Sequence, residues 1–308
     1  MDLLQTIGKG RIFLVAIVAF VLSSCDKVSK PELTQPCNLK NIHITKTNTD
    51  VNTRKVLVQD YTGHTCGNCP RAAENLEDIL VAHPKTVIPM AVHAGSQFSP
   101  PSMPDYPEDF RTAIGSAWDS KMGYSAAGLP KGTVNWSVYP YPQARTAWSN
   151  LVTAELAEAQ KAKIEMTTRL DTVAVSVAVE AKVTLLTAIN YHLKIAVLIT
   201  EDSIVASQKD YNPPTGVTVV NGDERPDYVF MHMLRGGLTG TSGDILKRGP
   251  VSAKFEITKT YCGNITPWIR NGNPKKNLKN VAIVVIVYAE DYNGSPKEVL
   301  QVEKVYVE

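Results

Sequence analysis

Two cysteines separated by two residues are the part of this chain best suited to redox chemistry: Cys66-Gly67-Asn68-Cys69. When such a pair lies at a helix start, the second sulfur can reach the first, and the free backbone N–H groups and helix dipole favour a thiolate on Cys66. That thiolate would attack a substrate disulfide, and Cys69 would resolve the mixed disulfide. Zinc knuckles and structural disulfides share this spacing, so the neighbouring residues must decide between these interpretations.

A strand and a helix are predicted on either side of this motif. An apolar run, 55–60, ends in Asp60, six residues before the first cysteine. Farther along, Pro130 precedes a strand-like segment, 133–136. X-Pro bonds are the ones for which the cis isomer costs little, so a cis Pro130 is expected. After the motif, small and apolar residues recur at helical spacing: Ala73, Leu76 and Leu80.

This stretch resembles the thioredoxin superfamily, in which a buried acid lies six residues before the first cysteine and a cis-proline faces the cysteines. The resemblance implies that Asp60 relays protons to and from Cys69 and that Pro130 shapes a substrate groove. Taken alone, Asp60 could simply end a strand, and Pro130 could be an ordinary loop proline. His64 could stabilise a thiolate when protonated, or hydrogen-bond within the loop.

The chain also departs from the thioredoxin pattern. Thr65 stands where thioredoxins usually carry tryptophan, and Pro70 directly follows the second cysteine, where proline begins to be costly in a helix. The distance from Cys69 to Pro130 predicts an insertion at 96–124. These features favour a second hypothesis, in which the cysteine pair is a permanent clip in a binding protein.

The N-terminus predicts export and lipidation. A basic start and an apolar run, 12–22, are typical of a secretory signal peptide, predicted here as residues 1–24. The Leu-Ser-Ser-Cys sequence that closes it resembles a bacterial lipobox, which implies that Cys25 is lipidated and becomes the first mature residue. Residues 25–50 then form a lipidated N-terminus and a polar tether. We therefore expect the protein to bind a membrane through this lipid anchor.

Export places the remaining cysteines in an oxidising environment, where disulfides persist. Four cysteines besides Cys25 allow three pairings. The simplest of these joins Cys66 to Cys69 and adds a structural staple between Cys37 and Cys262.

The second half of the chain is predicted to be all-β. Strands without intervening helices predict an antiparallel, immunoglobulin-like sandwich over residues 167–308. The predicted fold class is therefore an α/β thioredoxin-like domain, residues 51–166, followed by an all-β, immunoglobulin-like sandwich domain. The strands of this half are expected where apolar residues alternate or form short runs: 173–179, 192–200, 228–234, 252–260, 281–289 and 299–307.

Composition and motifs exclude several functions. The formal net charge is +2 without a basic run, so nucleic acid is not an expected partner. The sequence has neither a P-loop nor a dinucleotide fingerprint, and no cofactor is expected. His64, His93 and the two cysteines offer soft ligands for copper or zinc, but the other histidines carry no ligand spacing, so no metal site is predicted.

The layout as a whole is similar to a narrower family, the outer-membrane lipoproteins of Bacteroides-type bacteria first described as a twenty-eight-kilodalton outer-membrane protein. That family combines a lipobox, a β-rich C-terminal half and the motif context found here at 61–70, Tyr-Thr-Gly-His-Thr-Cys-Gly-Asn-Cys-Pro. The resemblance implies an outer-membrane location, on either the periplasmic or the cell-surface face.

Two functions follow from these patterns. The first is thiol–disulfide exchange with thiols or disulfides of envelope proteins through Cys66 and Cys69, which would make the protein an oxidoreductase. The second is a non-enzymatic surface lipoprotein that binds a protein or glycan partner, with the C-x-x-C pair as a structural disulfide.

Overall fold

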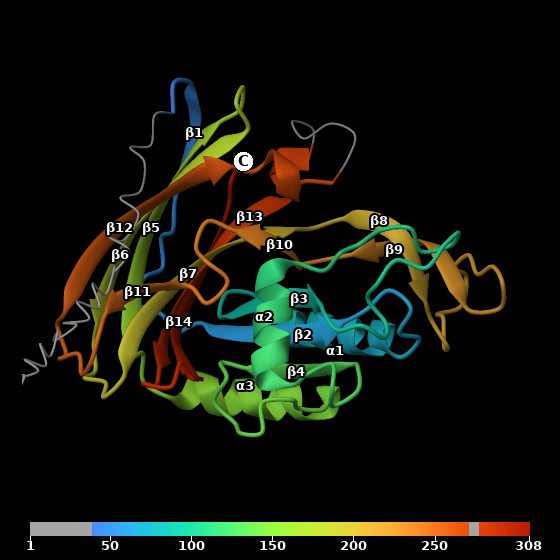
Figure 1. Cartoon of the computed structure of the whole chain (residues 1–308), viewed down its shortest axis with the longest axis horizontal. Coiled ribbons are helices and arrows are strands. Elements are labelled where there is room, and N and C mark those ends of the chain that lie inside the picture. The colour runs from blue at the N-terminus through green and yellow to red at the C-terminus, as the bar shows by residue number, and fades with distance from the viewer. Residues whose placement is uncertain (1–38, 271–276) are drawn as a thin grey trace, which may run out of the picture. The chain divides into compact units, whose positions relative to one another are not determined.

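The computed structural model describes residues 39–270 and 277–308, which belong to one compact unit. Strands outweigh helices throughout this part of the chain (Figure 1). The signal segment, with Cys25, and the tether cysteine Cys37 lie outside the described residues.

A four-stranded antiparallel sheet, here called the small sheet, has the order β1-β5-β6-β12. Buried and more exposed residues alternate along β5, because one face of this sheet packs on the core and the other meets water. Its strands are β1 (Ile42–Thr47), β5 (Ala162–Asp171), β6 (Ser176–Leu185) and β12 (Glu256–Asn264).

A larger mixed sheet has the order β14-β13-β7-β10-β3-β2-β4, with β11 also pairing with β7. Its strands are β2 (Val56–Thr62), β3 (Val87–His93), β4 (Lys131–Val134), β7 (His192–Glu201), β10 (Met233–Gly237), β11 (Asp244–Lys247), β13 (Val281–Glu290) and β14 (Pro296–Tyr306). β2 and β3 are parallel, and β10 adds to β3 in parallel where Met233 lies opposite Ala91. β10 therefore joins strands from both halves of the chain into one sheet.

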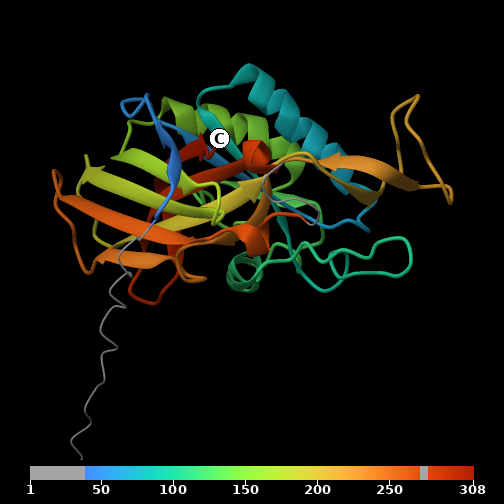
Figure 2. The ribbon, with the colours of Figure 1, turned by 90° about the horizontal axis from the view of Figure 1, so that it is seen from above.

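Helices cover both faces of one end of the large sheet. Figure 2 shows α1 and α3 on one side of it and α2 on the other. α1 connects β2 to β3, because parallel strands need a crossover. The helical elements are α1 (Cys69–Ala82), α2 (Ala113–Met122) and α3 (Trp148–Ala157), with short 3₁₀ turns η1 (Arg145–Ala147), η2 (Thr266–Trp268) and η3 (Leu278–Asn280).

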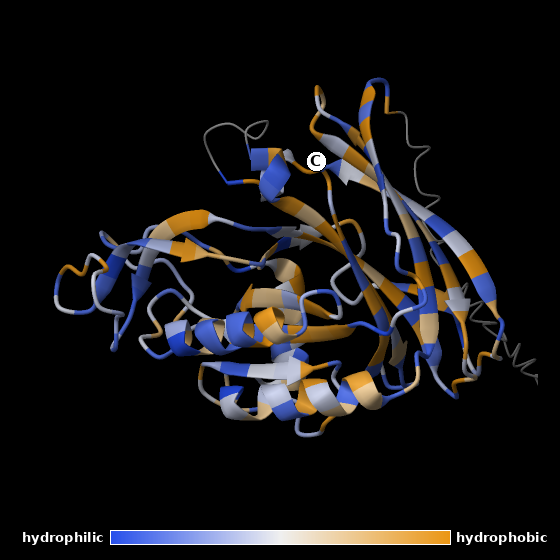
Figure 3. Ribbon diagram, turned by 180° about the vertical axis from the view of Figure 1, so that it is seen from behind, coloured by the Kyte–Doolittle hydropathy of each residue, from blue (hydrophilic) through white to orange (hydrophobic). Residues whose placement is uncertain are grey.

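The large sheet is buried on both faces, as β13 illustrates. Every residue of β13 is buried, and its side chains alternate between two cores. Val285 belongs to the core under the small sheet, whereas Ile286 belongs to the core that contains α2. At the other end of the sheet, Val56 of β2 packs in a third core with α1 and α3, and Leu57 faces α2. Figure 3 shows the hydrophobic colouring concentrated on these central strands.

A two-stranded hairpin, β8 (Ile204–Lys209) and β9 (Glu224–Phe230), forms a separate pairing. One of its faces is buried against Phe110. On its other face, Val205 and Val229 lie opposite each other and are about half exposed.

The predicted fold class, a thioredoxin-like α/β domain followed by an all-β, immunoglobulin-like sandwich, is wrong. Strands dominate the described chain, and β2, β3 and β4 belong to the same sheet as β7, β13 and β14. The β2–α1–β3 unit is therefore one edge of a larger sheet and not an α/β domain of its own. β10, a strand of five residues, connects the two parts of the sheet by pairing with β3 and β7. Because these partners are distant in sequence, no local periodicity indicates the connection.

Candidate functional site

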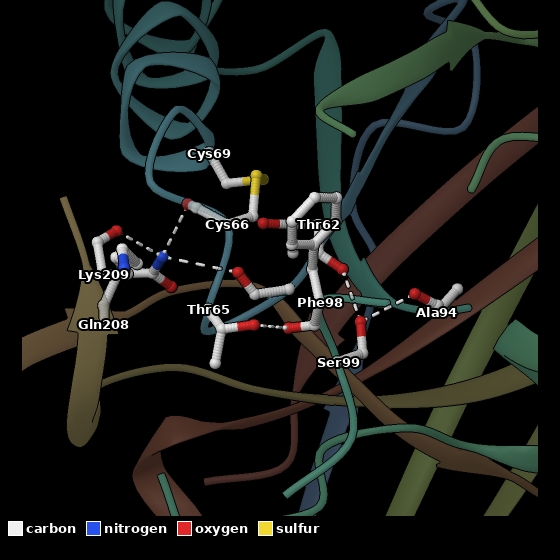
Figure 4. The surroundings of a disulfide bond; sticks show 10 residues. Thr62, Thr65, Cys66, Cys69, Ala94, Phe98, Ser99, Gln208 and Lys209 are labelled. Atoms are coloured by element: carbon white, nitrogen blue, oxygen red, sulfur yellow. Dashed lines mark hydrogen bonds between the residues drawn. A yellow bond between two sulfur atoms is a disulfide. The ribbon is translucent and has the colours of Figure 1, made fainter. Parts of the chain in front are cut away.

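Cys66 and Cys69 form a disulfide at the junction of β2 and α1 (Figure 4). Their Cα atoms are 5.4 Å apart. The turn is set by two backbone hydrogen bonds, in which Cys66 N–H donates to Gly63 O (3.0 Å) and Cys69 N–H donates to Cys66 O (3.1 Å). Pro70 occupies the first turn of α1, where the absence of an N–H leaves no helical hydrogen bond unmade.

Both cysteines are buried, with exposed fractions of 3% and 2%. The segment 208–211, at the end of β8, covers their loop and is called the cover segment below. It is joined to the loop by three hydrogen bonds from successive parts of its chain: Lys209 N–H donates to His64 O (2.8 Å), Tyr211 N–H to Gly67 O (2.9 Å) and Gln208 Nε2 to Cys66 O (3.1 Å).

The loop is packed closely from two directions. A Cβ atom at Gly67 would lie 2.6 Å from the ring of Tyr211, so a larger residue would not fit there. From another direction, the N–H and Oγ1 of Thr65 both donate to Phe98 O, each at 3.1 Å (Figure 4). The C-x-x-C loop is therefore held between two other segments of its own chain.

A buried carboxylate fastens the cover segment to α1. Asp210 is fully buried, and its Oδ2 accepts hydrogen bonds from Arg71 of α1 and Arg225 of β9, each at 3.1 Å. Its Oδ1 accepts from Asn212 N–H at 3.0 Å. Removing one partner of such a buried pair is strongly destabilising, because the other charge remains desolvated. The cover segment is thus fixed to the start of the helix.

Asp60 lies within β2, and only 2% of its surface is exposed. Its Oδ1 has no hydrogen-bond partner among the described residues. Burial raises the pKa of Asp60 to about 8, because an ionised carboxylate would lose its hydration. The carboxyl group is therefore mainly protonated at neutral pH.

His64 and His93 lie in a buried aromatic cluster. His64 Nε2 is 2.9 Å from Pro100 O, and its ring stacks on Tyr106. Burial lowers the pKa of His64, and it lowers the pKa of His93 far more. The ring centroids of the two histidines are 6.0 Å apart, and neither nitrogen of His93 has a partner among the described residues. A neutral His64 bound to a backbone oxygen fits the predicted loop hydrogen bond better than a thiolate-stabilising charge.

Potential metal ligands do not gather in the described chain. Both sulfurs of the motif are occupied by the disulfide. No group of three or more histidine, cysteine, aspartate or glutamate side chains in residues 39–270 and 277–308 could hold a metal ion.

Pro130 follows a cis peptide bond and lies close to the helix start. It lines a cavity of about 280 Å³ together with Asn68 and Arg71. Cys262 lies far along the chain in β12, opposite Ala178 of the small sheet, and is disulfide-bonded. Its predicted partner, Cys37, lies outside the described residues, so the pairing stays a prediction.

Sequence reasoning did not find the cover segment. The run that follows it, Asn-Pro-Pro at 212–214, indicates only a turn. The contacts that matter join residues more than 140 positions apart, such as Gln208 and Cys66. No periodicity in either segment indicates that they meet.

The fold and site together describe a mostly β protein with two main sheets, a separate two-stranded hairpin and an enclosed disulfide. Residues 117–308, more than half of the chain, match the family model described as Outer membrane protein Omp28. The protein belongs to this family of outer membrane proteins, and the predicted outer-membrane location is confirmed. The match does not include the C-x-x-C motif and gives no support to the thioredoxin resemblance. Within the described residues, no helix has the length and apolar character needed to span a membrane.

Solved structures that are similar to this chain include the following two, whereas no curated protein sequence matches it. HBP35 of Porphyromonas gingivalis has a TM-score of 0.59 at 15% identity, over 83% of this chain and 76% of that one. A protein of Agrobacterium tumefaciens has a TM-score of 0.49 at 12% identity, over 83% of this chain and 96% of that one. At these identities, the first likeness concerns the fold alone.

Proposed function

We propose that this protein is a non-enzymatic outer-membrane lipoprotein that binds a protein or glycan partner, and that the Cys66–Cys69 bond is structural. The enclosure of the C-x-x-C loop carries this proposal. Thiol–disulfide exchange requires that a thiolate reach a sulfur atom along an open path. Both cysteines are buried, and the cover segment occupies the adjoining face with hydrogen bonds to the carbonyl oxygens of His64, Cys66 and Gly67.

The lipid anchor at Cys25 is part of the same proposal and rests on the lipobox-like sequence. Cells that express the full chain and are fed radiolabelled palmitate should incorporate label into the wild-type protein. The Cys25→Ser variant should incorporate none and should leave the membrane fraction. Label retained in that variant would contradict the anchor without bearing on the disulfide.

The reduction potential of the Cys66–Cys69 bond tests the structural role. The mature, detergent-solubilised protein is equilibrated with dithiothreitol buffers, alkylated and analysed by mass spectrometry. A structural disulfide should titrate below about −300 mV. A potential between about −270 and −120 mV, the range of disulfide oxidoreductases, would restore thiol exchange as the function.

The rate of reduction tests the cover segment directly. Asp210→Asn weakens the ion pairs to Arg71 and Arg225, so dithiothreitol should reduce the bond at least about tenfold faster than in wild type. Asp105→Asn, an exposed loop change, is the matched control and should leave the rate unchanged. Equal rates in all three proteins would show that the cover does not protect the disulfide.

A further inference from the structure

A pocket of about 250 Å³ lies between α1 and the connection from β9 to β10. Its apolar walls come from both sides: Ala73 and Leu76 of α1, Ala91 of β3, and Val229 and Met231 at the end of the hairpin. Its charged lining is almost entirely acidic: Asp60, Glu74, Glu77 and Asp78, with His232 as the one basic residue. An acidic, partly apolar pocket of this kind complements a cation that carries a hydrocarbon chain.

Asp60 distinguishes this pocket from an ordinary acidic surface. It is the only acidic residue of the lining that is buried, and its Oδ1 has no hydrogen-bond partner in the described chain. Burying a polar oxygen without a partner costs free energy, so a fold selected for stability alone would not keep it. Because Asp60 lines the pocket and one of its carboxyl oxygens has no partner, a ligand in the pocket could supply a hydrogen-bond donor to this carboxyl group.

Tyr228 links this buried carboxyl to the pocket rim. Burial, and then the negative charge of Asp60, raise the pKa of Tyr228, with a further contribution from Glu74. The charges of Asp60 and Glu74 therefore both raise the pKa of the Tyr228 phenol group, and the three residues line one pocket.

The other acids of the rim are not equivalent. Glu74 already pairs with Arg71 at 2.7 Å, and Glu77 lies 3.3 Å from His232 Nε2. Asp78 is exposed and, within the described residues, makes no ion pair. Unpaired negative charge therefore remains at the rim, and below it the buried Asp60 carboxyl has an oxygen without a hydrogen-bond partner.

We propose that this pocket binds a primary alkylammonium group, with the ammonium at Asp60 and the alkyl chain along Leu76, Ala91 and Met231. An ammonium is a compact charge with three donors on a flexible stem, so it can supply the missing hydrogen bond while methylene groups cover the apolar walls. The group belongs either to a lysine side chain of a partner protein or to a free polyamine. The site goes beyond the proposed function and does not depend on the role of the disulfide.

Calorimetric titration of the mature, detergent-solubilised protein with n-pentylammonium chloride at low salt tests the site. Wild type should bind it saturably, and n-pentanol, which has the same chain without the charge, should bind at least about tenfold more weakly. Asp60→Asn should lower the affinity at least about tenfold. Glu158→Gln, a carboxylate removed at the end of α3, is the matched control and should bind like wild type.

A second variant keeps the test decisive if Asp60→Asn alters the fold. Glu74→Gln combined with Asp78→Asn changes only exposed residues of α1 and should weaken binding several-fold, by roughly the strength of two rim charges. Equal affinity for n-pentanol and n-pentylammonium, or wild-type affinity in both variants, would overturn the proposal.

The pH dependence of binding is a third readout. The other titratable residues that line the pocket with Asp60 are Glu74, Glu77 and Asp78 of α1, Tyr228 of β9, and His232. Because Asp60 is mainly protonated at neutral pH, binding of an ammonium should release a proton, and affinity should rise from pH 6 to pH 9. Affinity that is flat over this range would exclude Asp60 as the partner of the ammonium.

Comparison of two probes then identifies the source of the group. Tighter binding of Nα-acetyl-lysine methylamide than of spermidine would support a lysine side chain of a partner protein, and the reverse order would support a free polyamine. The reduction potential of Cys66–Cys69 is measured separately, so failure of this site and failure of the structural disulfide are distinguishable.

Discussion

The two ends of the large sheet are equally buried but differ in what they bury. At the β13 end, apolar side chains alternate between two cores, and the buried Lys194 and Glu290 satisfy each other with contacts of 3.0 and 3.1 Å. At the β2 end, every residue of the strand is also buried. Yet one carboxyl oxygen of Asp60, and both ring nitrogens of His93 on the adjacent strand β3, have no partner among the described residues.

This difference separates a stabilising region from a functional one. Unpaired buried polar groups lower the free energy of unfolding, and native proteins keep few of them. Local rules are typically broken where function requires it. The β2 end, which holds the pocket and the disulfide, is therefore where we place function, and the β13 end is where we place most of the stability.

The largest expected effect tests the β13 end. Ile283→Ala removes a fully buried side chain from the core under the small sheet, and should lower the free energy of unfolding by about 2 to 5 kcal/mol. Urea unfolding at pH 7 measures it. Val205→Ala, on the half-exposed face of the hairpin, is the control and should cost far less. Similar losses in the two variants would remove the basis for calling this end the stable one.

At the β2 end, substitution of a buried residue should raise the free energy of unfolding instead of lowering it. The pKa of Asp60 is raised in the folded state, so folding takes up a proton and stability falls as pH rises from the ordinary aspartate value of 3.8 toward about 8. Asp60→Asn removes this penalty and should raise the free energy of unfolding at pH 7, by on the order of 2 to 4 kcal/mol.

Urea unfolding of both proteins across pH 4 to 8 measures the difference. It should be smallest near pH 4 and grow toward pH 8. A variant that is destabilised at pH 7 would show that Asp60 has partners that compensate for its burial.

The strands of the stable end could be predicted from sequence because their burial is local and periodic. The predicted strand 281–289 corresponds to β13, and the predicted strand 192–200 corresponds to β7. The predicted strand 228–234 is instead two strands, β9 and β10, separated at His232, which has a positive φ of 57°. A left-handed backbone conformation at a non-glycine residue leaves little trace in composition.

The site was only partly accessible to sequence reasoning. Spacing placed Cys66 and Cys69 at a helix start, and the thioredoxin resemblance implied that Pro130 lies near them. In the structure, the disulfide lies at the start of α1, and Pro130 lines a cavity with Asn68 and Arg71. Spacing did not indicate that Asp210 and Tyr211 cover the loop, because those contacts depend on long-range packing of the hairpin. The covering contacts, and not the motif, favour a structural disulfide over thiol–disulfide exchange.

The disulfide itself should make a smaller contribution than the buried side chains. Closing a loop of four residues removes little entropy from the unfolded chain, so Cys66→Ser with Cys69→Ser should lower the free energy of unfolding by about 2 kcal/mol. Urea unfolding of the oxidised wild type and the double variant measures it. Binding of n-pentylammonium should be retained in the double variant. A fully unfolded variant would mean that the bond holds the whole β2 end in place.

The smallest expected effect is the pH dependence of stability that His93 causes at the β2 end. Burial holds its pKa well below 6.5, so the unfolded chain binds a proton that the folded chain does not, and stability should fall as pH drops below 6.5. One such group contributes at most about 1.4 kcal/mol per pH unit. His93→Phe places a third phenyl ring beside Phe110 and Phe230, whose ring centroids lie 5.2 and 5.5 Å from that of His93, and removes both unpaired nitrogens.

The variant should therefore lose less stability than wild type between pH 6.5 and 5, as followed by urea unfolding at closely spaced pH values. His43→Phe, a change at an exposed histidine, is the control and should keep the wild-type slope. An unchanged slope in His93→Phe would assign the acid sensitivity to other groups. A shallower slope in His93→Phe alone would show that the β2 end loses stability to the unpaired titratable groups it buries, whereas at the β13 end the buried Lys194 and Glu290 pair with each other.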